Sequence, residues 1–310
     1  MAFVQNLEND EFRDGFLVTS DRKRLWNAEI ELILEFQRVC EKHNLKFWAT
    51  GGTLLGAVRH RGFIPWDDDT DLVMPRADYD RLKQIAPTEF RYPFYFDLWY
   101  EHPKTSLSVY GCWPVIPFIK IRNLTTSMIE HPHQKHIKQG IFIDIFPMDP
   151  FPPFDDSPEP EKVKQEYKML KMLFELACRP KFLCENMKKD PNRKFLLPRE
   201  EIERLLKEPL NVRGKMLEDH LSNFNHESKY FNIGWHRFPL EHTYIASERV
   251  WWNETIYLPF EKISVPVPKE FDLILKKRYG NYMEFPSKHV NHSVNYSTMI
   301  SSEEYFASQR

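Results

Sequence analysis

The sequence predicts a mixed fold of the α+β or α/β class, in which helices flank a sheet and a further group of helices is inserted. Residues 21–43 repeat apolar side chains every three or four positions, the period of an amphipathic helix. Residues 115–122 and 141–146 alternate as strands do. Residues 161–222 are charged and again helical in pattern. The 310-residue chain is 42% hydrophobic and 28% charged, an ordinary globular composition that can bury a sizeable core.

The first elements lead to a pair of glycines. The helix over 21–43 is predicted to begin with Asp21 as its N-cap and to continue into a short strand at 46–50. Gly51 and Gly52 then form a turn that opens a brief helix over 53–58. The amides at the start of that helix can bind phosphate, so the turn is a candidate phosphate site.

Four aspartates within five positions follow this turn: Asp67, Asp68, Asp69 and Asp71. They repel one another, so a folded chain keeps them solvated, paired with cations or bound to a metal. Asp69 and Asp71 lie two apart at the start of an apolar strand and project from one face, so together they can hold a divalent ion. Oxygen ligands favour Mg²⁺ or Mn²⁺.

Two other interpretations of the acidic cluster are open. A solvated loop is common for acidic runs, but it needs neither the preceding Gly-Gly-Thr, the neighbouring basic residues 59–61, nor Pro65-Trp66. A calcium loop would carry the regular acid spacing and the glycine of an EF-hand, which are missing here. The segment beyond the cluster, residues 76–85, is predicted as a helix.

The two later strands each carry charge where a strand should be apolar. Lys120 and Arg122 share one face of their strand. Asp144 lies on a face with Phe142 and Phe146. A charged residue at such a place needs a partner. A phosphate would serve Lys120 and a metal would serve Asp144, whereas a turn cap or an ion pair with Lys120 would give Asp144 a structural role.

The stretch GGTLLGAVRHRGFIPWDDDTDLVMPRADYDRL resembles the signature of the LicD family of nucleotide-diphosphate-dependent phosphotransferases, which includes the fukutin-like proteins. FIKIRN, GIFIDIFPMDP and YGNYMEFP agree with it, so the resemblance runs from about residue 25 to residue 292 with a poorly matching middle. It implies a nucleotidyltransferase-like fold with a mixed sheet. It also implies a phosphate and metal site formed by Gly52, Thr53, Asp69, Asp71 and Asp144.

The resemblance implies a transferase that moves a phospho-alcohol from a CDP-activated donor to a sugar hydroxyl of a cell-surface glycan or glycolipid precursor and releases CMP. CDP-choline is the leading donor, before CDP-ribitol and CDP-glycerol. Asp69, Asp71 and Asp144 would be catalytic and would hold the Mg²⁺ or Mn²⁺. The residues expected to bind the donor phosphates are Gly51, Gly52, Thr53, Arg59, Arg61 and Lys120.

Two alternatives to this function are open. A nucleotidyltransferase would attack the α-phosphate of an NTP with the same core residues and expel pyrophosphate. A catalytically inactive scaffold on the same fold would have lost one of the acids, and all three are present.

The expected organisation is a catalytic core at 1–150, a helical insertion at 151–225, and an aromatic-rich part at 226–310 that completes the catalytic domain. The proline-rich stretch 147–160 marks the boundary and is expected to form neither helix nor strand. The insertion either covers the core or docks an anionic or lipid-linked acceptor.

A net charge of −2 argues against a nucleic-acid partner. No apolar run is long enough to span a bilayer. The four cysteines, whose spacing is unlike that of a zinc site, are expected to be reduced thiols. We therefore expect a cytoplasmic protein, with peripheral contact to the inner face of the membrane as a further option.

Histidines and aromatic residues supply the remaining candidates. His131, His133 and His136 form either a zinc site or a polar loop, and His289 and His292 either contact substrate or lie on the surface. A choline donor would need an aromatic cage. The cage candidates are Trp235, Trp251, Trp252, Tyr279 and Tyr282, which could equally be core residues, and a polyol donor would instead need polar partners such as Asn281, Asn291 and His292.

Overall fold

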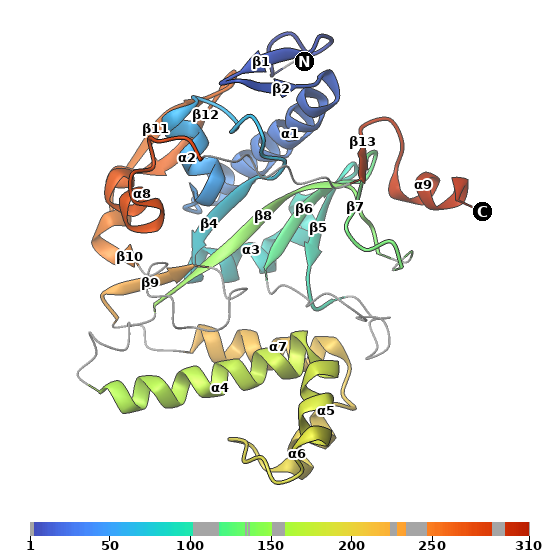
Figure 1. Cartoon of the computed structure of the whole chain (residues 1–310), viewed down its shortest axis with the longest axis vertical. Coiled ribbons are helices and arrows are strands. Elements are labelled where there is room, and N and C mark those ends of the chain that lie inside the picture. The colour runs from blue at the N-terminus through green and yellow to red at the C-terminus, as the bar shows by residue number, and fades with distance from the viewer. Residues whose placement is uncertain are drawn as a thin grey trace. The chain divides into compact units, whose positions relative to one another are not determined.

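The fold, a computed structural model, has mixed α and β structure, as the sequence predicts (Figure 1). The chain folds into two compact units: Met1–Asp97, Ile119–Pro147 and Arg249–Arg310 form the first, and Leu98–Phe118 and Met148–Glu248 form the second. The domain boundaries expected from the sequence stay predictions. The structure describes residues 3–101, 118–133, 135, 137–150, 159–223, 228–233, 247–286 and 295–309.

The first unit begins with a hairpin of β1 (Glu11–Arg13) and β2 (Phe16–Val18), followed by α1 (Ser20–His43). The predicted helix is confirmed, but its predicted cap is wrong. Thr19 is the N-cap, because its extended backbone lets its side-chain oxygen accept the N–H of Arg22. Asp21 lies in the first turn, where a negative charge is favourable, and pairs with Arg24 at 2.5 Å.

The elements around the glycine pair follow the predicted order: β3 (Trp48–Ala49), α2 (Gly51–Arg59), β4 (Asp71–Pro75) and α3 (Arg76–Glu89). Helix α2 includes both glycines and so begins two residues earlier than predicted. Gly51 has a φ of 55°, a left-handed conformation that glycine adopts without the strain of a side chain.

The sheet of the first unit has the strand order β5 (Phe94–Leu98), β6 (Ile119–Asn123), β8 (Ile141–Pro150), β4, β3. Strands β6 and β8 are antiparallel, and their register places Lys120 opposite Asp144. A smaller antiparallel pair joins β7 (Ser127–Ile129) to β13 (Asn295–Ser297).

The expectation that residues 147–160 form neither helix nor strand is wrong at both ends. Residues 147–150 continue β8, and α4 begins at Pro160. Proline lacks an amide donor and is accepted in a strand where no ladder bond needs one. At the helix start, the missing donor of Pro160 costs nothing because the first amides of a helix have no partner within it.

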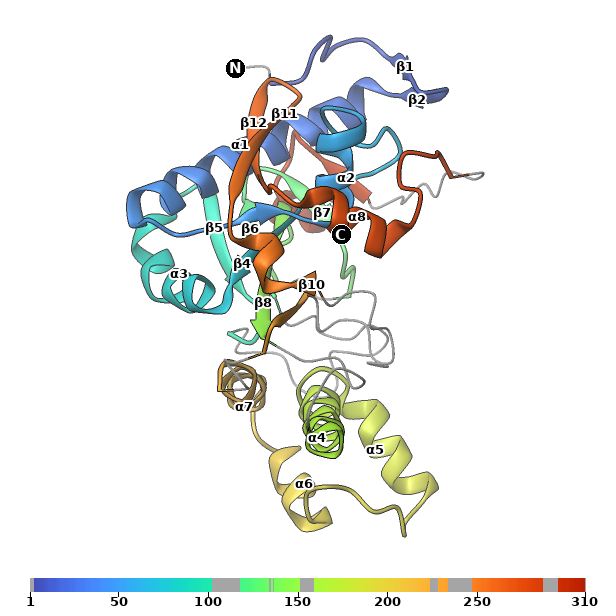
Figure 2. The same cartoon turned by 90° about the vertical axis from the view of Figure 1, so that its left-hand side faces the viewer.

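Aromatic residues build much of the core of the first unit. Trp26 stacks on Phe63 at 4.9 Å between ring centroids, and Phe63 packs edge-on against Phe260 at 4.7 Å. Phe260 belongs to the hairpin of β11 (Thr255–Phe260) and β12 (Ile263–Pro268), which is followed by α8 (Phe271–Tyr279) (Figure 2). The 3₁₀ helix η3 (Arg249–Trp252) precedes the hairpin, and α9 (Ser302–Ser308) follows β13.

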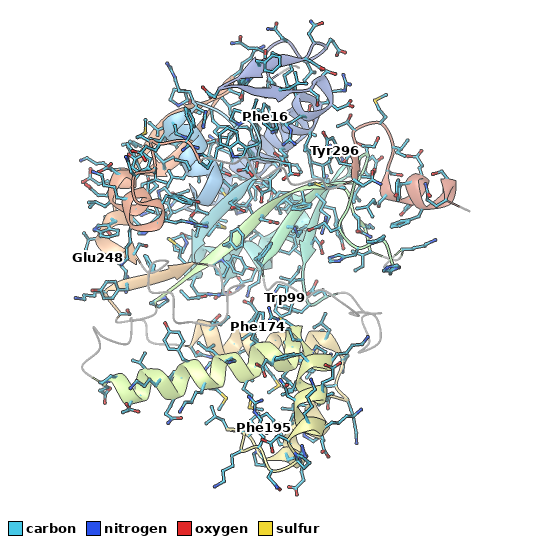
Figure 3. The ribbon with its side chains drawn as sticks, viewed as in Figure 1. Phe16, Trp99, Phe174, Phe195, Glu248 and Tyr296 are labelled. Carbon is cyan, nitrogen blue, oxygen red and sulfur yellow. The ribbon has the colours of Figure 1, made fainter. Side chains whose placement is uncertain are left out.

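The second unit contains α4 (Pro160–Cys178), α5 (Pro180–Lys189), α6 (Arg199–Leu205), α7 (Leu210–Ser222), β9 (Tyr230–Ile233) and β10 (Ser247–Glu248). Its helices share a core of their own, built around Leu176, Leu183 and Ile202. Trp99 donates to Glu218 of α7 at 3.2 Å; Trp99, Phe174 and Phe195 are labelled in Figure 3. The helices described in this chain include none with the length and apolar character needed to cross a bilayer.

Candidate active site

Two glycines at the start of α2 let acidic side chains lie directly against the backbone. A β-carbon on Gly51 would lie 2.7 Å from Oδ2 of Asp71, closer than side chains tolerate. A β-carbon on Gly52 would collide with the carboxylate of Asp67. The glycines are therefore required by the acids that lie over them, a relationship that the sequence alone did not show.

Thr53 fixes the start of the strand that carries Asp71. Its hydroxyl oxygen accepts the N–H of Asp71 at 2.8 Å, and the N–H of Thr50 donates to the carbonyl of Asp71 at 3.1 Å. The two threonines that flank the glycines thus fix the backbone of Asp71 through its N–H and its carbonyl. The hydroxyl of Thr53 can still donate its own proton, so the expected contact with phosphate stays a prediction.

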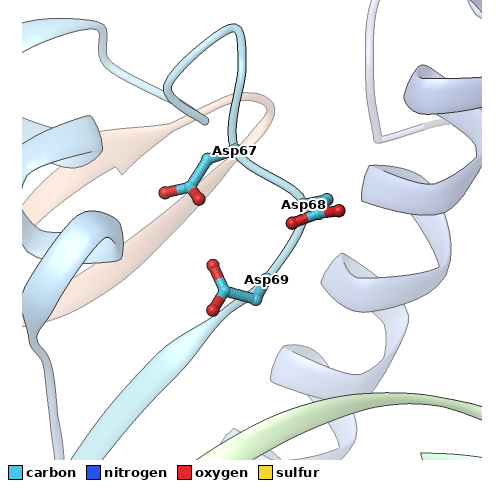
Figure 4. Close-up of side chains that lie close together, drawn as sticks. All are labelled: Asp67, Asp68 and Asp69. Carbon is cyan, nitrogen blue, oxygen red and sulfur yellow. The ribbon is translucent and has the colours of Figure 1, made fainter. Parts of the chain in front are cut away.

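The acidic segment brings three carboxylates together (Figure 4). Asp67, Asp68 and Asp69 each offer an oxygen within 4.8 Å of the others. The pKa of Asp67 is raised to about 9, first by burial and then by repulsion from Asp69 and Asp71. The pKa of Asp71 is also raised, by burial and by repulsion from Asp69 and Asp144.

This donor set fits a hard divalent cation. All the ligand atoms on offer are carboxylate oxygens, which suit Mg²⁺ or Mn²⁺. The raised pKa values show that negative charge is crowded here, and a cation would relieve that repulsion. The cluster includes Asp67, which the sequence reasoning did not choose as a ligand although it lies in the same acidic run.

The third predicted acid lies on the adjacent strand and is paired. Oδ1 of Asp144 lies 2.9 Å from Nζ of Lys120, so the ion pair considered as the alternative role of Asp144 is present. The N–H of Asp144 donates to the carbonyl of Thr70 at 2.8 Å, which ties β8 to the acidic segment. Burial raises the pKa of Asp144 to about 7 although Lys120 lowers it, and Asp69 contributes repulsion.

Lys120 belongs to a wider charge network. Its Nζ lies 3.2 Å from Glu130 and 3.2 Å from the ring centroid of Phe142. Arg122, on the same face as predicted, also contacts Glu130 and Phe142, at 3.3 and 5.0 Å, and donates to Asp97 at 2.6 Å. Glu130 and Asp97 had no sequence signal, because each lies outside the strand motif whose charges it balances.

Comparison with known proteins identifies the domain that carries this site. Residues 44–157 match the LicD/FKTN/FKRP nucleotidyltransferase domain. The resemblance to the LicD family is thus confirmed over these residues. The matched residues include the glycine turn, the acidic segment, Lys120 and Asp144.

Curated relatives match the chain over different shares of its length. Lipopolysaccharide cholinephosphotransferase LicD of Haemophilus influenzae is 24% identical over 261 residues, which cover 81% of this chain and 87% of that protein. Ribitol 5-phosphate transferase FKRP of Homo sapiens is 41% identical over 51 residues, 16% of this chain and 10% of that protein. The FKRP of Mus musculus matches to the same extent.

The arginines predicted to bind phosphate in the LicD domain have different surroundings. Nη1 of Arg59 donates to the carbonyls of Tyr282 and Glu284 at 2.8 and 3.1 Å, and its guanidinium lies over the ring of Phe285. Arg61 is exposed, and its carbonyl accepts the N–H of Glu261. Their phosphate roles stay predictions, and Arg59 in addition holds the segment after α8.

The sequence analysis missed two charged residues that lie near the acidic segment at 67–71. Nη2 of Arg278, from α8, lies 3.7 Å from the point where a β-carbon of Gly51 would be. Glu29 of α1 is fully buried and accepts the hydroxyl of Thr70 at 3.2 Å. Burial and repulsion from Asp69 and Asp68 raise the pKa of Glu29. Arg278 directly precedes the YGNYMEFP block and Glu29 lies in the helix predicted at 21–43, but neither position has a local pattern that indicates proximity to the acids.

The histidine and cage candidates receive little support from the described residues. Among these residues, His131 and His133 are in no cluster of metal-ligand type, whereas residues 67–69 are. Trp252 is buried and packs edge-on against Trp48, and the hydroxyl of Tyr282 donates to Asp272. The candidates that lie outside the described residues are His136, Trp235, His289, Asn291 and His292.

Proposed function

We propose that this chain is a metal-dependent phosphotransferase that moves a phospho-alcohol from a CDP-activated donor to a sugar hydroxyl of a glycan or glycolipid precursor. The observation that carries the proposal is the close approach of the Asp67 and Asp71 carboxylates to the Gly51–Gly52 turn, within the matched LicD domain. The names of two curated relatives, a cholinephosphotransferase and a ribitol 5-phosphate transferase, support transfer of a phospho-alcohol.

In this reaction the acceptor hydroxyl oxygen forms a bond to the distal phosphorus of the donor. The bond from that phosphorus to the bridging oxygen breaks, CMP leaves with the electron pair, and the hydroxyl proton is lost. Such a transfer needs alignment and neutralisation of charge more than covalent help from the protein. The site offers acids, a glycine turn and basic groups, and contains the residue types that this chemistry requires.

Asp69, Asp71 and Asp144 are the proposed metal ligands, with Asp67 beside them. A bound Mg²⁺ or Mn²⁺ would neutralise charge on the donor diphosphate. Asp71 as a residue is half-buried. The backbone N–H of Asp71 donates to the hydroxyl of Thr53, and the backbone N–H of Asp144 donates to the carbonyl of Thr70. These two hydrogen bonds keep the acids in place.

Asp144 is also the proposed group that favours loss of the acceptor proton. Its pKa of about 7 is near neutral pH, where a carboxylate is a better proton acceptor than an ordinary aspartate. Lys120 holds the carboxylate at 2.9 Å and favours its charged form. The pair therefore orients the acid and offsets part of the negative charge that builds up in the transition state.

Choline is the leading alcohol because the cholinephosphotransferase match spans most of both chains. A quaternary ammonium group is held by aromatic faces, since it cannot donate hydrogen bonds. Of the five aromatic candidates, Trp252 and Tyr282 have structural contacts and Trp235 is outside the described residues. Lys277 and Arg278 lie over the rings of Trp251 and Tyr279, at 5.8 and 5.4 Å from the ring centroids, so the contacts single out none of the five as the cage. The cage stays a proposal, and the transferase function does not depend on it.

The test is a comparison of products from several nucleotides in the presence of Mg²⁺. We expect CMP from CDP-choline, with CDP-ribitol and CDP-glycerol as further donors, first with water and then with a panel of methyl glycosides as acceptors. Asp71→Asn should lose CMP release, and Asp219→Asn, which changes an exposed acid on α7, should keep it. Pyrophosphate from CTP or ATP with no CMP from any CDP-alcohol would show a nucleotidyltransferase instead.

A further inference from the structure

We propose that Arg278 binds the donor diphosphate beside the Gly51–Gly52 turn. This inference rests on the proposed function and adds to it a residue from α8, a segment outside the 44–157 match. Arg278 would thus add a C-terminal cation to a donor site whose other predicted cations, Arg59, Arg61 and Lys120, lie within residues 44–157.

Arg278 and Asp71 both lie close to the position that a β-carbon of Gly51 would occupy. The β-carbon that Gly51 lacks would lie 2.7 Å from Oδ2 of Asp71 and 3.7 Å from Nη2 of Arg278. The carboxylate and the guanidinium therefore flank one glycine at the first turn of α2.

The donors of Arg278 are not consumed by the protein residues that the structure describes. Within them it forms neither an ion pair nor a hydrogen bond, and its guanidinium lies 5.4 Å from the ring centroid of Tyr279. The other cations near the site are engaged. Lys120 pairs with Asp144, Arg122 pairs with Asp97, and Arg59 donates to two carbonyls.

This arrangement suits a phosphate ligand better than a purely structural role. A guanidinium presents several N–H donors in one plane and can bind phosphate oxygens in pairs. A structural arginine at this place would pair with Asp71, which lies against the same glycine, yet within the described residues the two form no ion pair. An anion placed at the glycine turn would receive hydrogen bonds from Arg278 while the acids hold the metal.

Arg59 and its contacts fix the segment that follows Arg278. Nη1 of Arg59 donates to the carbonyl of Tyr282, and the hydroxyl of Tyr282 donates to Asp272 at the start of α8. The last residue of α2 is thereby tied to α8, and the last turn of α8 is kept near the first turn of α2. Arg59 is a positioning residue in this arrangement, and Arg278 is the phosphate contact.

The test is the affinity of purified protein for CDP in the presence of Mg²⁺, measured by calorimetry, with cytidine as the probe that lacks phosphate. Arg278→Met should weaken CDP binding by about tenfold or more and raise KM for CDP-choline in parallel. Arg278→Lys should recover part of the loss, because it restores the charge without the planar donors. Lys276→Met removes an exposed cation from the same turn and should change neither value.

Specific outcomes would overturn the inference. Wild-type CDP affinity in Arg278→Met, or an equal loss of CDP and cytidine binding together with a lower melting temperature, would make Arg278 a structural residue. Arg278→Gln, judged by the same criteria, replaces Arg278→Met if that variant does not fold. If the wild-type chain binds no CDP and releases no CMP from any CDP-alcohol, the proposed function fails first, and that result is recognisable without any variant.

Discussion

Lys120 and Asp144 face each other across β6 and β8, with Nζ 2.9 Å from Oδ1. Glu130 lies 3.2 Å from the same ammonium group. One lysine is thus the shared counter-charge of two carboxylates that repel each other. Because all three side chains are mostly shielded from solvent, the charge balance here affects stability as well as catalysis.

Lys120→Met should destabilise the protein by about 1–3 kcal/mol, because it leaves Asp144 and Glu130 without their shared counter-charge. Asp144→Asn should cost less, since Lys120 keeps Glu130 as a partner. The double variant should regain part of the stability lost in Lys120→Met. Denaturant melts of the four proteins measure the coupling, and strictly additive losses would show that the pair is not energetically linked.

Asp69→Asn and Asp71→Asn should each lower CMP release by orders of magnitude while the melting temperature without metal stays equal or rises. The amide keeps the size of the side chain, removes the charge a metal needs, and relieves repulsion within the acidic segment. Added Mg²⁺ should raise the melting temperature of the wild type more than that of either variant. Near-normal activity in both variants would exclude them as metal ligands.

Features with a local pattern were predicted well from the sequence. The helix at 21–43 and the shared face of Lys120 and Arg122 follow from periodicity, which the structure confirms. The acids beside the glycine turn belong to one continuous stretch, so their proximity was also accessible. The cap of α1 was missed because Thr19 and Asp21 both carry capping oxygens, and the backbone conformation at Thr19 decides between them.

Contacts between distant segments were not predictable from this single sequence. Arg278 approaches Gly51, and Glu130 approaches Lys120, through the path of the whole chain rather than through a repeated spacing. The same holds for Arg59, whose basic neighbours suggested phosphate binding but whose guanidinium donates to carbonyls of the C-terminal part. A charged side chain in a motif can thus be committed to a structural contact that only the fold reveals.

Glu89→Gln should lower the melting temperature by about 1–3 °C at pH 7, and the difference should disappear in acid. Hydrogen bonds from Lys42 and His43 lower the pKa of Glu89 to about 2 from its usual 4.5, which ties the end of α1 to the end of α3. A lowered pKa stabilises the fold above pH 4.5, and this contribution is lost as the pH falls towards 2.

Melting curves of Glu89→Gln and wild type between pH 7 and pH 2 measure this loss. Glu203→Gln, at an exposed position of α6, is the matched control and should follow the wild type. A difference for Glu89→Gln that stays constant down to pH 2 would contradict the role of this ion pair.

Gly51→Ala should lose both stability and turnover, because it adds a collision with Asp71 to the strain of a left-handed alanine, which alone costs roughly 1–2 kcal/mol. Gly15→Ala separates the two effects. Gly15 also has a positive φ, at 78°, but a β-carbon there would meet nothing within 4 Å. The control should therefore show the strain without loss of CMP release.

Gly52→Ala tests the second acid without backbone strain, because the φ of Gly52 lies outside the left-handed region. Its β-carbon collides only with the carboxylate of Asp67 among the close contacts, so Asp67→Ala in the same chain should restore the melting temperature. If Asp67 serves the metal site, the double variant regains stability but not CMP release. Full recovery of both would show that Asp67 has no part in transfer, and recovery of neither would show that Gly52 is required for another reason, such as access of the donor phosphates to the backbone of α2.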